Sequence, residues 1–105
     1  MRHYFVVYIT TADQREAEEI AQILLEKKLA ACVNIIPGIT SLYRWQGKIE
    51  KSKELLLVVK TRKDLFERLV KEVKKHHSYT VPEIIATEIE KGDQTYLKWL
   101  EGSVK

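Results

Sequence analysis

The sequence has few of the residues that mark several specialised protein classes. Among its 105 residues are one cysteine, two prolines and four glycines. A single cysteine, Cys32, excludes an internal disulfide framework and any CxxC metal or redox motif. No apolar run approaches the roughly 20 residues that a membrane-spanning helix needs, and no glycine-rich phosphate loop is present. The composition therefore indicates an ordinary globular protein without membrane insertion.

The charge is modest and evenly spread. Eighteen basic and fifteen acidic residues give a net charge of +3 and are mixed along the chain. Because no basic stripe follows from this pattern, we expect no nucleic-acid partner. The N-terminal residues do not form a signal peptide, and one cysteine suits a reducing compartment, so we expect a cytoplasmic protein. The length predicts one domain, residues 1–105.

Hydrophobic periodicity predicts the order βαββαβ followed by one more helix. Tyr4–Ile9 and Leu55–Val59 are continuous apolar runs, as expected for strands that are covered on both sides. Two right-handed crossovers joined by a hairpin give a ferredoxin-like antiparallel α+β sheet, in which these two strands are central. Thr11 and Thr61 are predicted to cap the first two helices, and Glu83–Glu90 is predicted as the last strand.

A long central β-hairpin is the most unusual predicted element. Its arms run from Cys32 to Trp45 and from Lys48 to Thr61, around a Gln46-Gly47 turn and past a bend at Pro37-Gly38. Each arm would span roughly 45 Å, whereas the first helix spans only about 24 Å. The hairpin must therefore extend beyond the helices while carrying apolar side chains, and a second subunit is the expected cover. A solvated, twisted ribbon is the alternative.

The segment His76–Ile84 concentrates the chemistry of the chain. It contains His76, His77, Tyr79 and Glu83 directly after the second predicted helix. Imidazole and carboxylate groups bind divalent metals, but neighbouring helical residues point about 100° apart. Both histidines can reach one ion only if the loop reorients one of them. Otherwise His77 packs in the core and His76 interacts with the helix end.

Other residues offer weaker signals. Cys32 lies among small apolar residues and is predicted to be buried, not nucleophilic. No nucleophile–base pair is visible, so no enzyme is expected, and the aromatic signature of an RNA-recognition sheet is missing. Several polar and aromatic residues are candidates for a cleft or interface between subunits: Asn34, Tyr43, Trp45, Lys60, Tyr79 and Trp99.

Five segments together resemble the CutA divalent-cation tolerance family: Ala30–Asn34, Ser41–Glu50, Lys60-Thr61, His76–Ile84 and Tyr96–Leu100. The resemblance covers the whole chain in order. It implies a trimer of ferredoxin-like subunits, similar in architecture to the PII signalling proteins, and a link to copper tolerance. It also implies His76 and His77 as metal ligands, together with a cysteine at the position where this chain has Ile9.

The resulting functional hypothesis is a homotrimer that binds copper or another divalent metal ion weakly. Its predicted ligands are His76, His77 and Glu83, and no organic cofactor is expected. The alternative is a PII-like signalling or adaptor trimer whose inter-subunit clefts hold a small ligand or a protein partner.

Overall fold

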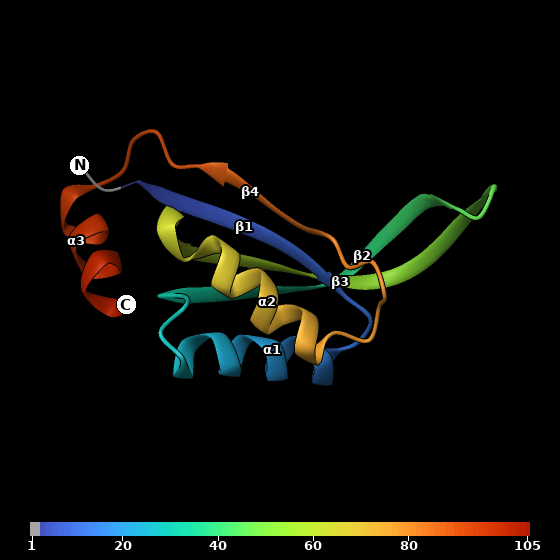
Figure 1. Ribbon diagram of the computed structural model, residues 1–105. Coiled ribbons are helices and arrows are strands. Elements are labelled where there is room, and N and C mark those ends of the chain that lie inside the picture. Colours follow the sequence, from blue (N-terminus) through green and yellow to red (C-terminus); the bar gives the residue numbers. More distant parts are fainter. Residues whose placement is uncertain (1–2) are drawn as a thin grey trace.

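The computed structural model describes residues 3–105. They form a four-stranded antiparallel sheet in the order β2-β3-β1-β4, with two helices on one face and a third helix at one end (Figure 1). The predicted ferredoxin-like α+β order is confirmed. The first two residues of the predicted domain lie outside the described residues. The elements are β1 (Tyr4–Thr11), α1 (Gln14–Glu26), β2 (Cys32–Trp45), β3 (Lys48–Arg62), α2 (Phe66–His76), β4 (Ile84–Glu88) and α3 (Gln94–Ser103).

The two continuous apolar runs form the middle of the sheet, as predicted. Strand β1 pairs along its full length with residues 55–62 of β3, and it also pairs with the short edge strand β4. Side chains alternate between the two faces of a strand, so every second residue of β1 and β3 faces the helices. These helix-facing residues are fully buried: Val7, Ile9, Leu57 and Val59.

Helices α1 and α2 lie side by side and antiparallel against one face of the sheet (Figure 1). Each is amphipathic, so that its apolar side completes the core and its charged side faces solvent. Burying one such leucine or isoleucine side chain contributes about 1.5–3 kcal/mol. The buried residues of the core that these helices supply are Ala17, Ile20 and Leu24 of α1, and Leu69 and Val73 of α2.

The predicted helix caps are wrong. Helix α1 is capped by Asp13, whose carboxylate accepts a hydrogen bond from the Glu16 backbone N–H at 2.8 Å, while Thr11 still belongs to β1. Thr61 also remains in its strand, and its buried hydroxyl donates to the Leu29 carbonyl at 2.6 Å. A 3₁₀ turn separates β3 from α2. Strand pairing thus uses both threonines before the helices begin.

The hairpin of β2 and β3 extends well beyond the helical layer (Figure 1). Gln46 and Gly47 have φ values of 50° and 78°, as a tight type I′ turn requires, and the register shifts between Ile36 and Ile39 at the predicted bend. The described residues extend 44 Å along their longest axis but only 25 and 23 Å across it. The projecting arms expose large apolar side chains: Leu42, Tyr43, Trp45 and Ile49.

Within residues 3–105, no helical layer covers the face of the sheet opposite α1 and α2, and α3 contacts only one end of the sheet, through Tyr4 and Arg62. A row of residues crosses it from β2 to β4, because Asn34 pairs with Val58, Val58 with Tyr8, and Tyr8 with Ile85. Ile85 is 56% exposed. The last strand is shorter than predicted, since β4 covers only Ile84–Glu88 of the range 83–90. A single subunit therefore presents an apolar sheet surface that continues onto its hairpin.

Candidate functional site

The histidine segment begins where helix α2 ends. His76 is the last helical residue, and its Nε2 lies 3.4 Å from a carboxylate oxygen of Glu72, one turn earlier. This i, i+4 spacing places both side chains on the same helix face. The same carboxylate lies 3.0 Å from the Lys27 amino group, and Lys75 approaches its other oxygen at 3.7 Å. Attraction to Lys27, opposed by burial and reinforced by Lys75 and His76, lowers the pKa of Glu72.

His77 points in a different direction, because its backbone is extended and carries the chain out of the helix. Its side chain is fully buried. Nδ1 accepts a hydrogen bond from the Tyr79 backbone N–H at 3.1 Å, so the ring proton resides on Nε2, which donates to the Thr10 carbonyl at 2.8 Å. Both ring nitrogens of His77 are therefore engaged, and the ring links the loop to the end of β1.

Glu16 stabilises the same loop from helix α1. Its carboxylate accepts hydrogen bonds from the backbone N–H groups of Ala12 at 3.0 Å and Ser78 at 2.6 Å. Burial opposes ionisation, but these hydrogen bonds and the nearby ring of His77 outweigh it and lower the pKa of Glu16. An ionised Glu16 thus holds together the start of α1 and the loop after α2.

The lowered pKa of Glu16 predicts an acid-sensitive contribution to stability. A carboxylate with a folded-state pKa below its unfolded value stabilises the protein above the unfolded pKa. This contribution is lost as the pH falls through the folded pKa. The free energy of unfolding should therefore decline less between pH 6 and pH 3 in Glu16→Gln than in the unchanged protein, as measured by urea titrations. Parallel pH profiles would contradict this role.

Tyr79 connects the loop to the base of the hairpin. Its hydroxyl donates to a carboxylate oxygen of Glu54 at 2.7 Å, and Glu54 is buried. Desolvation, followed by the nearby Glu54 carboxylate and smaller effects of Tyr43 and Glu16, raises the pKa of Tyr79. The phenol therefore remains protonated and acts as a donor. Of the predicted cleft residues, Tyr79 thus lies against Glu54 of β3.

The other predicted cleft residues lie elsewhere in the subunit. Lys60 donates to the Asn34 side chain across β2 and β3, and its amino group is 3.9 Å from the sulfur of Cys32, which is only partly buried. Trp99 stacks at a tilt on Tyr96, with ring centroids 5.4 Å apart, on α3. Trp45 lies at the hairpin tip. Within one chain these residues do not line a single cleft.

Glu83 is exposed in the loop before β4, and within residues 3–105 no hydrogen bond or ion pair joins it to His76 or His77. Among residues 3–105, no three His, Cys, Asp or Glu side chains gather closely enough to hold a metal ion. Three imidazole–carboxylate pairs do meet among these residues: His76 with Glu72, His77 with Glu16, and His3 with Glu88. The sequence reading missed Glu72, although its i, i+4 spacing from His76 was a usable signal. It also missed Glu16 and Glu54, whose roles depend on long-range contacts.

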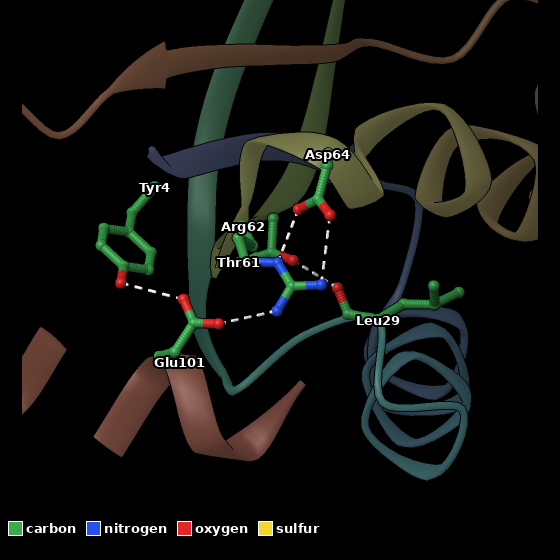
Figure 2. Close-up of polar contacts among 6 residues, drawn as sticks. All are labelled: Tyr4, Leu29, Thr61, Arg62, Asp64 and Glu101. Atoms are coloured by element: carbon green, nitrogen blue, oxygen red, sulfur yellow. Dashed lines mark hydrogen bonds and ion pairs between the residues drawn. The ribbon is translucent and has the colours of Figure 1, made fainter. Parts of the chain in front are cut away.

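A second polar network anchors α3 and was not predicted. Arg62 binds both carboxylate oxygens of Asp64 and reaches Glu101 on α3 at 2.9 Å (Figure 2). Tyr4 donates to the other Glu101 oxygen at 3.0 Å. Beside this network, the loop after β4 and one side of α3 border an open groove of about 970 Å³. The network fixes the last helix at the strand ends that lie opposite the hairpin tip.

The fold and these contacts define a class of protein: an α+β subunit of ferredoxin-like order, with a projecting hairpin and an uncovered apolar sheet face. Residues 5–103 match the family described as CutA1 divalent ion tolerance protein. The chain belongs to this family.

Individual relatives support the assignment. The divalent-cation tolerance protein CutA of Thermus thermophilus is 53% identical over 95 residues, covering 90% of this chain and 92% of the relative. Its solved structure has a TM-score of 0.95 and covers 97% and 99% of the two chains, at 49% identity. The Archaeoglobus fulgidus structure, titled as a periplasmic divalent cation tolerance protein, has a TM-score of 0.93 at 48% identity and covers both chains completely.

Some relatives are longer than this chain. It covers only 55% of the chloroplastic CutA protein of Arabidopsis thaliana, to which it is 45% identical over 100 residues. Within residues 3–105, no helix has the length and apolar character to cross a membrane.

Proposed function

We propose that this divalent-cation tolerance protein is a non-enzymatic, cytoplasmic homotrimer that binds copper or another divalent cation weakly. The observation that carries the metal proposal is the approach of His76 Nε2 to within 3.4 Å of the Glu72 carboxylate. Imidazole nitrogen and carboxylate oxygen are donors that suit Cu²⁺ and Zn²⁺. His76 retains one third of its side-chain exposure, so an ion can reach it from solvent.

Weak binding follows from the surroundings of this pair. Two protein donors leave most coordination positions to water, and Lys27 and Lys75 compete for the same carboxylate. His77 can contribute only by giving up its hydrogen bond to Thr10 or to Tyr79. Its participation, and that of Glu83, stays a prediction.

The trimer proposal is supported by the apolar surface that one chain leaves open. The sheet face opposite the helices and the projecting hairpin expose large apolar side chains, among them Leu42, Ile49 and Ile85, and contiguous exposed apolar patches mark interaction surfaces. The number of subunits comes from the family resemblance. The alternative PII-like role in signalling also stays a prediction, since its proposed pocket residues lie in several places and do not line a single cleft within one chain.

Calorimetric titration of Cu²⁺ and Zn²⁺ into metal-free protein tests the site. Replacing His76 by alanine removes one of two donors, so the dissociation constant should rise at least about tenfold. His3→Ala is the matched control, because His3 is also exposed and contacts a carboxylate, that of Glu88. The affinity of the His3→Ala variant for the metal should remain unchanged. Equal binding by His76→Ala, or loss of binding in His3→Ala alone, would contradict the assignment.

A further inference from the structure

A positively charged hollow lies between the end of α1 and the exposed side of α2. Its volume is about 220 Å³. Helices α1 and α2 lie together on one face of the sheet (Figure 1). The hollow is lined by residues of α2 and of the segment after α1, whereas the apolar surface is on the other face, so covering that surface leaves the hollow open. The lining residues are Lys27, Leu29, Arg68, Lys71, Glu72 and Lys75.

The hollow holds more positive charge than its own carboxylate neutralises. Four lining residues are cationic and one, Glu72, is anionic. Glu72 pairs with Lys27 and Lys75, but no ion pair within residues 3–105 includes Arg68 or Lys71. Two cations on adjacent turns of α2 therefore line the same small space without an ion pair of their own. Concave basic surfaces of this kind concentrate anions.

The size and composition of the hollow favour a small oxyanion. Ligand pockets for drug-sized molecules have volumes of about 300–1,000 Å³, and this hollow is smaller. The planar guanidinium of Arg68 can donate two parallel hydrogen bonds to a phosphoryl group, and the lysines add point charges. Leu29 supplies the only apolar lining. The cations surround one compact site, whereas binding along a nucleic acid needs an extended basic track.

We propose that this hollow binds a single phosphoryl group, either as free phosphate or as a phosphate monoester. Arg68 and Lys71 are its principal partners. Lys27 and Lys75 assist once they turn from Glu72, which acts as an internal competitor for the same cations. The proposal does not depend on metal binding, because its main partners do not include His76.

Titrations of metal-free protein with inorganic phosphate and with methyl phosphate, in EDTA at low salt, test the proposal. Phosphate and methyl phosphate should both bind saturably if the hollow recognises the phosphoryl group. A preference for one of them shows whether the ligand is free phosphate or a phosphate monoester. Arg68→Gln/Lys71→Gln should weaken binding at least about tenfold. Lys91→Gln/Lys98→Gln, the same charge change in the groove beside α3, should leave it unchanged. Calorimetry and amide chemical shifts supply the readouts.

Glu72→Gln gives a test with the opposite sign. Removing the competing negative charge should tighten phosphate binding about fivefold, an effect that non-specific loss of structure cannot produce. Circular dichroism in chloride confirms that each variant is folded. The proposal is overturned if neither probe binds, if both double variants lose affinity equally, or if Glu72→Gln binds more weakly while folded. It is also overturned if a short DNA duplex binds through Arg68 and Lys71 while phosphate does not.

Discussion

Replacing His77 by alanine is expected to lower the free energy of unfolding by about 3–5 kcal/mol, whereas His76→Ala should lower it by less than about 1 kcal/mol. The two neighbouring imidazoles differ because only His77 has a fully buried side chain. Its loss leaves a cavity and removes the partners of the Thr10 carbonyl and the Tyr79 N–H. His76 is partly exposed and contacts only Glu72 in an i, i+4 pair, for which small effects are usual.

Urea unfolding of both variants measures this difference. Both are measured at the same protein concentration, because the stability of an oligomer depends on concentration. The histidine pair then separates by role: His77 affects folding, and His76 affects metal affinity. Similar losses of stability in the two variants would contradict the hydrogen-bonding role of His77. A stable His77→Ala protein that no longer binds metal would show that both histidines are ligands.

Ile85→Glu is expected to convert the proposed trimer into a monomer. In one chain Ile85 is exposed on β4, so a carboxylate there remains hydrated and costs little in folding. In an assembly that covers this sheet face, three symmetry-related carboxylates would be buried without partners, at a cost of several kcal/mol each. The mass measured by light scattering should fall from about 37 kDa, three times the 12.3 kDa of one chain, to that of one chain.

Leu25→Glu is the matched control for this experiment. Leu25 is also an exposed apolar residue, but it belongs to α1 on the opposite layer of the subunit. The same substitution there should leave the mass unchanged. A monomeric parent protein, or an Ile85→Glu variant that keeps the mass of the parent, would refute assembly through the uncovered sheet face.

Several features of the fold could be predicted because they depend on short-range pattern. The apolar runs of β1 and β3 predicted their central positions, since only strands covered by neighbours on both sides avoid alternation. Gln46-Gly47 predicted the hairpin turn because glycine adopts a positive φ without steric cost. The helix caps were mispredicted because Thr11 and Thr61 remain in strands. Their strand-pairing partners lie about 45 or more positions away in the chain, and no local motif contains these partners.

The candidate site likewise combines features that the sequence predicts with features that depend on the tertiary structure. That His76–Ile84 is rich in metal-binding and titratable side chains is a property of the sequence alone. Whether two adjacent histidines converge depends on where the helix ends, and the extended backbone of His77 turns its ring toward β1. The cationic hollow was invisible in the sequence, because Lys27 and Arg68 are brought together only by the packing of α1 against α2.

The sequence by itself determined the order of the elements, the length of the hairpin and the apolar character of the surfaces, because residue periodicity and strand geometry act over a few positions. Only the tertiary structure decided which histidine is buried, which carboxylate each one contacts, and where unpaired cations collect. These outcomes depend on helix packing and on hydrogen bonds between segments far apart in the chain, and the energies that select them are those of burial and polar pairing.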